Sequence, residues 1–227
     1  MTKTNQSIDE NQTNAAARRA KGEFVRGISS FRHAIGDPGF PAEPRRYHLF
    51  VAFNCPWCHR VTLARNLLGL QNSISLDVAF PNRTDESDPD GPNQWQFAPE
   101  LTASLTGTPL PECTTETGTG QNLRLVPQIY AAEGSNERSV PILYDKQQKR
   151  IVNNESAEII RMLNTHAKAL GNASTTRPDL YPRDVEKRAE IDALDRFPTD
   201  MNQLNRKCPE RPQAGRVFPI QVARKTV

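Results

Sequence analysis

Two cysteines two residues apart, in the sequence Cys-Pro-Trp-Cys at residues 55–58, constrain this chain more than any other feature. An apolar run precedes them over residues 47–53, and apolar side chains at helical spacing follow over residues 61–69. A Cys-x-x-Cys at a junction between a strand and a helix is typical of a redox motif. The alternative is a pair of small buried side chains, which is the usual role of free cysteines.

The junction predicts an activated thiol at Cys55. Pro56 suits the first position of a helix, because its missing N–H has no partner to lose there and its φ is already helical. Cys55 then lies at the N-cap, where free backbone N–H groups and the positive end of the helix dipole stabilise a thiolate. We expect a pKa below the usual value of about 8.5. Cys58 falls one turn into the helix, and we expect its sulfur to point toward the helix body.

The order of predicted elements indicates an α/β fold of the thioredoxin type. A strand over 47–53, a helix over 56–70 and an alternating strand over 74–80 make a parallel βαβ unit. Residues 81–122 are rich in Asp, Pro, Gly and Thr, and we expect a long loop there. The remaining elements are a short helix over 123–132, strands over 139–145 and 150–152, and an amphipathic helix that opens at 153–156.

Two later segments supply candidate binding residues for the same site. In a thioredoxin fold, a proline that opens the strand opposite the cysteine helix is the place of a cis peptide, so Val140-Pro141 is expected to present the Val140 backbone to a peptide-like ligand. An ordinary trans proline at a strand start is the alternative. Glu155 and Ser156 begin a helix, where N–H groups and a hydroxyl bind carboxylates and Glu155 attracts an ammonium group. Simple helix capping is the alternative there.

Composition favours a cytoplasmic redox protein that acts on a small molecule. No apolar run approaches the roughly 20 residues of a membrane span, and the polar N-terminus lacks the apolar segment of a secretory signal. Four cysteines in 227 residues are too few for a disulfide scaffold, and their spacing predicts no metal site. The net charge of +3 arises in residues 196–227, which carry seven basic and two acidic side chains, so the body predicts no nucleic-acid partner.

The sequence resembles the glutathionyl-hydroquinone reductases, which are the Xi-class glutathione transferases. The segment Ile-Val-Asn-Asn-Glu-Ser-Ala-Glu-Ile-Ile-Arg-Met at residues 151–162 is the most specific match. The other matching segments are residues 40–49, 55–57, 59–60, 140–145, 179–182 and 190–194. The resemblance covers roughly residues 22–195 and implies glutathione as co-substrate, no metal, and a homodimer in the family that is doubtful for this chain.

The resemblance also implies roles for individual residues. Cys55 would be the nucleophile, Val140 would bind glutathione through its backbone beside Pro141, and Glu155 with Ser156 would hold its γ-glutamyl end. Members of the family place a tryptophan over the glutathione after the second strand, and Trp95 is the candidate here. A buried anchor for the loop is the alternative for Trp95.

Three departures from the family pattern stand out. Cys58 occupies a place where the family usually has alanine, so it is a candidate resolving cysteine. Pro127 stands where the family has an arginine that contacts glutathione, and Arg124 is the nearest substitute. The pattern also stops near Asp195, which indicates a truncated or altered helical domain.

These patterns predict five parts of the chain. They are a disordered leader (1–22), an extended arm (23–46), a thioredoxin-like glutathione-binding domain (47–166, with the loop 81–122), a linker with the first helix of a truncated helical domain (167–195), and a divergent basic tail expected to be disordered (196–227).

Three functions fit this sequence. The first is a glutathione-dependent transferase or reductase whose Cys55 thiolate reduces glutathionyl-quinol conjugates through a mixed disulfide with glutathione. The second is a dithiol oxidoreductase of the glutaredoxin or dehydroascorbate-reductase type, in which Cys58 attacks that mixed disulfide. The third is a non-catalytic remnant that only binds glutathione.

Overall fold

A computed structural model of the chain describes residues 29–108, 110 and 112–194. The predicted leader (1–22), the start of the predicted arm and the predicted tail (196–227) lie outside the described residues. The compact unit that carries the cysteine motif runs to Arg188, and residues 189–194 fall in a second unit. In the described part of the chain, no helix has the length and apolar character that a membrane crossing needs.

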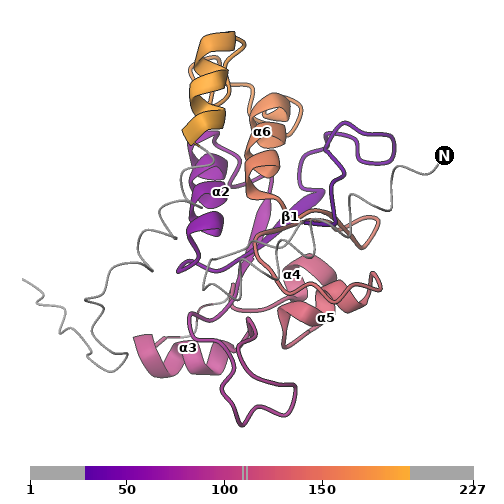
Figure 1. Ribbon diagram of the computed structural model, residues 1–227, viewed down its shortest axis with the longest axis vertical. Helices are drawn as coiled ribbons and strands as arrows, with labels where there is room; N and C mark the ends of the chain where they lie inside the picture. The colour runs from indigo at the N-terminus through magenta and orange to yellow at the C-terminus, as the bar shows by residue number, and fades with distance from the viewer. Residues whose placement is uncertain (1–28, 109, 111, 195–227) are drawn as a thin grey trace, which may run out of the picture. The chain divides into compact units, whose positions relative to one another are not determined.

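A mixed sheet of four strands forms the centre of the unit (Figure 1). Its strands are β1 (Tyr47–Val51), β2 (Ser75–Val78), β3 (Ile142–Asp145) and β4 (Arg150–Asn153). They lie in the order β2-β1-β3-β4, with β1 parallel to β2 and antiparallel to β3, and β3 antiparallel to β4. The parallel pair joined by a helix and the antiparallel hairpin that follows are the arrangement that the sequence predicts.

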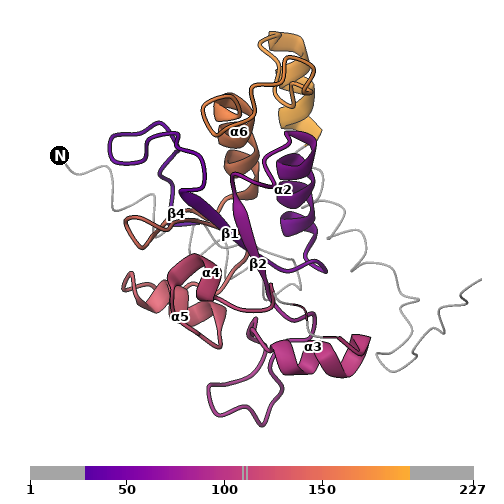
Figure 2. The ribbon, with the colours of Figure 1, turned by 180° about the vertical axis from the view of Figure 1, so that it is seen from behind.

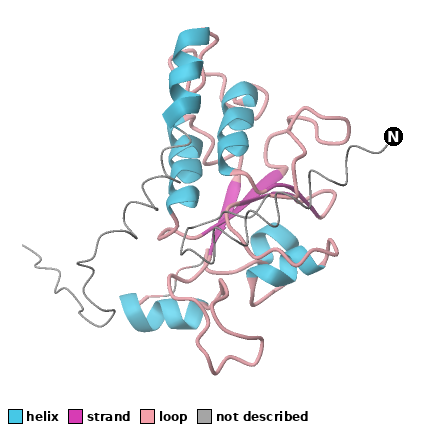
Figure 3. Ribbon diagram, in the orientation of Figure 1, coloured by secondary structure: helices cyan, strands magenta, loops and turns pink. Residues whose placement is uncertain are grey.

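Helices cover the two faces of this sheet. Helices α2 (Pro56–Leu67) and α6 (Ser156–His166) pack side by side on one face. Helix α4 (Glu116–Thr119) packs on the other face against β1 and β2, and α5 (Val126–Ala131) lies beside α4 in both views (Figures 1 and 2). Most of the residues between these elements form loops (Figure 3).

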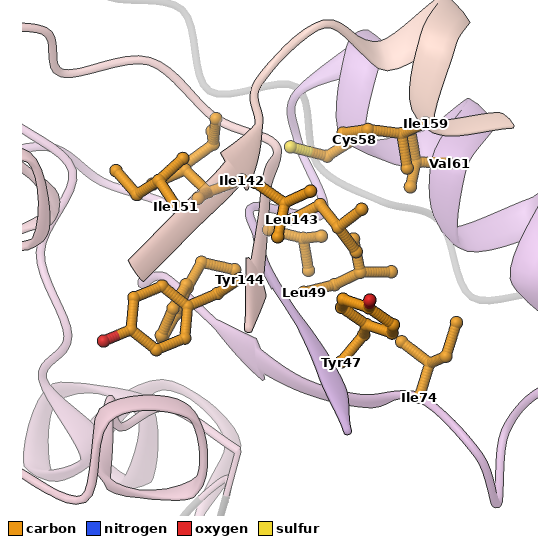
Figure 4. Packing of buried hydrophobic residues seen from close by; sticks show 14 of the residues in the cluster. Tyr47, Leu49, Cys58, Val61, Ile74, Ile142, Leu143, Tyr144, Ile151 and Ile159 are labelled. Carbon is orange, nitrogen blue, oxygen red and sulfur yellow. The ribbon is translucent and has the colours of Figure 1, made fainter. Parts of the chain in front are cut away.

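Successive side chains of β1 point to opposite faces of the sheet, so this strand contributes to the packing on both faces. Tyr47, Leu49 and Val51 are fully buried and join the apolar cluster that also contains Cys58 of α2 (Figure 4). His48 and Phe50 point to the opposite face, where a side chain added at Gly118 of α4 would collide with both. Both faces of β1 are buried, so its apolar character is nearly continuous, as for a central strand.

The segment 81–122 differs from the expected long loop, because it contains two short helices. Helix α3 (Pro99–Thr106) begins with a proline at its first turn and ends at Gly107, whose φ of 78° is left-handed. The buried sulfur of Cys113 accepts a hydrogen bond from the Ala98 N–H at 3.3 Å and ties the start of α3 to the following turn. Tertiary contacts of this kind stabilise short helices that sequence periodicity does not reveal.

The other boundaries agree within a few residues. The predicted strands 47–53 and 74–80 are longer than β1 and β2 at their ends, and α2 stops before Gly69, whose φ is 64°. In the described part of the predicted arm, Ile35 and Phe40 are buried. Arg32 forms a single antiparallel bridge with Asn153 of β4, which ties this segment to the edge of the sheet.

Candidate functional site

Cys55 lies at the N-cap of α2, where the loop after β1 turns into the helix. Its backbone is extended, with φ −94° and ψ 119°, and Pro56 follows at the first helical position. The pKa of the Cys55 thiol is lowered to about 6, first by a hydrogen bond from the Cys58 side chain and then, against the opposing effect of burial, by backbone N–H groups of Cys58 and Trp57 and the charge of Arg83. The N-cap contributes as the sequence predicts, but Cys58 contributes most.

Cys58 is fully buried in the apolar cluster below Cys55. Burial, followed by the hydrogen bond to Cys55 and the charge there, raises the pKa of the Cys58 thiol well above its ordinary value. Cys58 therefore stays protonated at neutral pH. Its buried place agrees with a sulfur directed into the protein, but the sequence did not predict that the same thiol would lower the pKa of Cys55.

Val140 closes the site from the opposite side. The Val140-Pro141 peptide is cis, as predicted, and both residues are buried where the chain enters β3. The carbonyl oxygen of Val140 lies 3.8 Å from the Sγ atom of Cys55. The structure thus brings the predicted backbone element and the thiol into contact.

Glu155 and Ser156 lie at the start of α6, and both side chains already form hydrogen bonds within the protein. Glu155 is the N-cap, and its carboxylate accepts a hydrogen bond from the Ala157 N–H at 3.5 Å, so the helix is capped by Glu155 itself and not by Asn154 or Ser156. Ser156 is fully buried, and its hydroxyl accepts from Nε and Nη2 of Arg60 at 3.0 and 2.6 Å. The same guanidinium reaches within 3.9 Å of the Glu155 carboxylate. The sequence predicts that the Ser156 hydroxyl binds a ligand carboxylate. In the structure this hydroxyl instead accepts from the Arg60 guanidinium of α2.

Trp95 is a buried anchor with a cation on its ring. Only 6% of its surface is exposed, and it belongs to the main apolar cluster, as the alternative reading expects. The guanidinium carbon of Arg83 lies 4.2 Å from the centre of its ring. The pair joins the segment after β2 to the core, and the charge of Arg83 acts on Cys55.

Arg124 faces two carboxylates instead of the cysteine motif. Its guanidinium donates to Asp88 at 2.8 and 2.6 Å and to Asp90 at 2.5 Å. These acids raise the pKa of Arg124. The structure therefore gives no support to Arg124 as the replacement for the family arginine.

Sequence reasoning missed two arginines near the site. Arg60 is in the matched family segment but was given no role, although its place two residues after Cys58 puts it on α2. Arg83 follows β2 closely, and the ends of parallel strands meet at one edge of a sheet, which was the available signal. Within the described ranges, no three His, Cys, Asp or Glu side chains gather as a metal site would require.

Comparison with known proteins relates this fold to the glutathione transferases. The family model "Glutathione S-transferase, N-terminal domain" matches residues 54–166. Glutathionyl-hydroquinone reductase PcpF of Sphingobium chlorophenolicum is 36% identical over 179 residues, which are 76% of this chain and 48% of that protein. Glutathionyl-hydroquinone reductase YqjG of Escherichia coli is 36% identical over 188 residues, at 76% and 49% coverage.

Solved structures give the same result. The glutathione transferase Xi of Phanerochaete chrysosporium has a TM-score of 0.63 at 33% identity, covering 84% of this chain and 60% of its own. The glutathione-bound structure of Escherichia coli YqjG has a TM-score of 0.57 at 33% identity, with 76% and 53% coverage. This chain spans about half the length of the curated relatives it matches. Residues 54–166 form a glutathione S-transferase N-terminal domain, and the chain is a homologue of the glutathionyl-hydroquinone reductases.

Proposed function

We propose that this protein is a glutathione-dependent reductase that uses Cys55 to remove the glutathionyl group from quinol conjugates. The observation that carries the proposal is the Cys55 sulfur itself. It lies at a helix N-terminus, its pKa is lowered to about 6 chiefly by the Cys58 side chain, and it lies 3.8 Å from the Val140 carbonyl oxygen. A thiolate with a pKa close to ambient pH is near the optimum for attack on sulfur.

The proposed reaction has two steps, and in each a thiolate attacks a sulfur atom. The Cys55 thiolate attacks the sulfur of a glutathionyl-quinol, a sulfur–sulfur bond forms, and the bond from sulfur to the quinol carbon breaks. The electron pair of that bond goes to the carbon, which takes up a proton and leaves as the free quinol. A second glutathione thiolate then attacks the mixed disulfide, releases oxidised glutathione and restores the Cys55 thiolate.

The residues around Cys55 fit the glutathione part of this substrate. In the proposed complex, the backbone of Val140 pairs with the cysteinyl backbone of glutathione in the manner of an added strand. Glu155 accepts from the γ-glutamyl ammonium group at the start of α6. Arg60, held on the Ser156 hydroxyl at 2.6 and 3.0 Å, supplies a positive charge for the adjacent γ-glutamyl carboxylate.

The presence of a second free thiol, Cys58, one helical turn after Cys55 favours a second candidate, a dithiol oxidoreductase. In that reaction the Cys58 thiol loses its proton and attacks the mixed disulfide at Cys55. The raised pKa of Cys58 argues against this step, because only the thiolate is nucleophilic.

Turnover measured with three substrates separates these candidates. A glutathionyl-quinol, a low-molecular-weight glutathione disulfide and dehydroascorbate are supplied to the wild-type protein and to the variants Cys55→Ser and Cys58→Ala. The proposal expects reduction of the glutathionyl-quinol by wild type and by Cys58→Ala, and none by Cys55→Ser. The dithiol candidate would be supported if wild type reduced only the disulfide or dehydroascorbate, and if both Cys55→Ser and Cys58→Ala lost this activity. Glutathione binding without any turnover would indicate a binding protein.

A further inference from the structure

A small cavity lies between two apolar clusters of the unit, beyond the end of β2. The main cluster includes Val78 and Ala79, and a second, smaller cluster consists of Phe80, Ala98 and Cys113. Side chains of both clusters line the cavity, which has a volume of about 160 Å³. A water molecule takes up about 30 Å³ in the liquid, so the gap between the two clusters is large enough for a bigger molecule.

Helix α3 forms one wall of this cavity. It lies apart from α2 and α6 in both views (Figures 1 and 2). Thr102 faces the cavity from α3, and Phe53 faces it from the loop after β1. The start of α3 is fixed by the hydrogen bond from the Ala98 N–H to the Cys113 sulfur at 3.3 Å. The cavity therefore has a fixed wall on the side of α3 and not only the walls of the sheet.

Polar groups in the lining already have partners within the protein. The backbone N–H groups of Ala79 and Phe80 donate to carbonyl oxygens of other segments at 2.7 and 2.8 Å. The Thr102 hydroxyl donates to the carbonyl oxygen one turn earlier in α3 at 3.3 Å. The described residues that line the cavity include no charged side chain. A buried water needs about two to four polar partners, so this lining favours an apolar occupant.

The volume and the lining match a single aromatic ring. A cavity of about 150 Å³ lined by aliphatic and aromatic side chains stays dry and binds benzene. Phe53 and Phe80 both line the cavity here, and aromatic rings attract one another in offset or edge-to-face arrangements. A charged group would lose its hydration in this cavity without gaining a partner. The occupant that fits is uncharged and about the size of benzene or toluene.

The cavity and the Cys55 sulfur lie on different sides of β1. In the sheet, β1 stands between β2 and β3. The sulfur of Cys55 lies 3.8 Å from the carbonyl oxygen of Val140, where the chain enters β3. The cavity instead adjoins the residues that follow β2. A ring bound there is therefore expected to leave the Cys55 sulfur open.

We propose that this cavity is a binding site for one uncharged aromatic ring, separate from the cysteine site. The ring enters beside Phe53, of whose surface 56% is exposed, and lies between Thr102 of α3 and the residues that follow β2. The removal of apolar surface from water drives binding, and no covalent step takes part. The proposal does not depend on the proposed function, because neither Cys55 nor glutathione is involved.

Toluene is the probe, because it is an uncharged ring without a hydrogen-bonding group. Calorimetry and thermal unfolding of the full, reduced chain at pH 7 measure its binding. Methylcyclohexane, with the same number of carbons but no aromatic ring, and benzoate, with a charge on the ring, are the comparison ligands. Toluene at ten times its dissociation constant should raise the unfolding midpoint by about 3–6 °C. Methylcyclohexane should bind more weakly, and benzoate should leave the midpoint unchanged.

Two variants fill the cavity from different elements. Ala79→Leu adds carbons at the end of β2, and Thr102→Leu adds one from α3. Each should weaken toluene binding about tenfold or more, because the added carbons and the ring compete for the same space. The unfolding midpoint without ligand verifies which variants are folded, and either one alone suffices. Ala103→Leu is the matched control, because Ala103 is the next residue of α3 but does not line the cavity.

The controls Ala103→Leu and Cys55→Ser should both bind toluene as wild type does. Wild type that does not bind toluene would overturn the proposal. So would equal affinity in wild type and in the folded filling variants, since the ring would then bind elsewhere. Loss of binding in Cys55→Ser would place the ring at the cysteine site, and benzoate binding as tight as that of toluene would contradict an apolar lining; either result refutes the proposal.

Discussion

Replacing Cys58 by alanine should change the pKa of Cys55 much more than the rate of turnover at neutral pH. The side chain of Cys58 is the largest cause that lowers the pKa of Cys55 to about 6. A hydrogen bond to a charged group contributes about 1.5–3 kcal/mol, which corresponds to a rise of about one to two pKa units when it is removed. The backbone N–H groups of the helix remain in the variant.

A higher pKa of Cys55 lowers the fraction of thiolate but makes each thiolate more nucleophilic, and these two effects on the rate nearly cancel. At pH 7 a thiol with a pKa of about 6 is about nine-tenths thiolate, and a rise of about one to two units leaves between about a half and a tenth. A more basic thiolate is also a better nucleophile, with a Brønsted coefficient of about 0.4–0.5, so its intrinsic reactivity increases by roughly threefold to eightfold. The product of the two changes stays within about twofold of the wild-type rate.

Alkylation by iodoacetamide as a function of pH measures the pKa, and reduction of a glutathionyl-quinol at pH 7 measures the rate. Cys58→Ala should move the alkylation midpoint upward by about one to two units and retain most of the turnover, while Cys55→Ser should have none. An unchanged midpoint would refute the hydrogen bond from Cys58 as the main cause. A Cys58→Ala protein as inactive as Cys55→Ser would refute the monothiol mechanism.

Three further predictions follow from single contacts. Glu155→Ala should raise the dissociation constant of glutathione about tenfold to hundredfold by calorimetry, and an unchanged constant would leave Glu155 with capping alone. Gly118→Ala should lower the free energy of unfolding by about 1–3 kcal/mol in urea, because the added carbon would lie 2.3 Å from Phe50 Cζ and 2.6 Å from His48 Cδ2; Thr117→Ala, at an exposed residue of the same helix, is the control. Burial lowers the pKa of His48, so the unfolded chain binds more protons, and the free energy of unfolding should fall as pH drops below about 6.5; His48→Gln should lose this dependence.

Local chemistry made most of the fold and part of the site predictable. The apolar run of β1, the alternation in β2, the proline at the start of α2 and the acidic residue at the start of α6 each follow from the local needs of one element. The same is true of Cys55, whose N-cap place is set by Pro56. Such features depend on neighbours in sequence, which a pattern can reveal.

The missed features depend on residues far apart in the chain. Helix α4 has Thr and Gly in place of an apolar stripe, and it is stabilised where Gly118 allows close approach to His48 and Phe50. The hydrogen bond from Arg60 to Ser156 joins two helices, and the stacking of Arg83 on Trp95 joins two parts of one loop. No periodicity predicts which arginine meets which partner.

The central claim is that the Cys55 thiolate takes up the glutathionyl group. Mass spectrometry of the intact protein and its peptides, after brief reaction with one equivalent of a glutathionyl-quinol and no free glutathione, tests it directly. The account predicts one glutathionyl group on the peptide that contains Cys55, in wild type and in Cys58→Ala, with release of the free quinol and no adduct in Cys55→Ser. An adduct at Cys113, or quinol released without any adduct at Cys55, would contradict it.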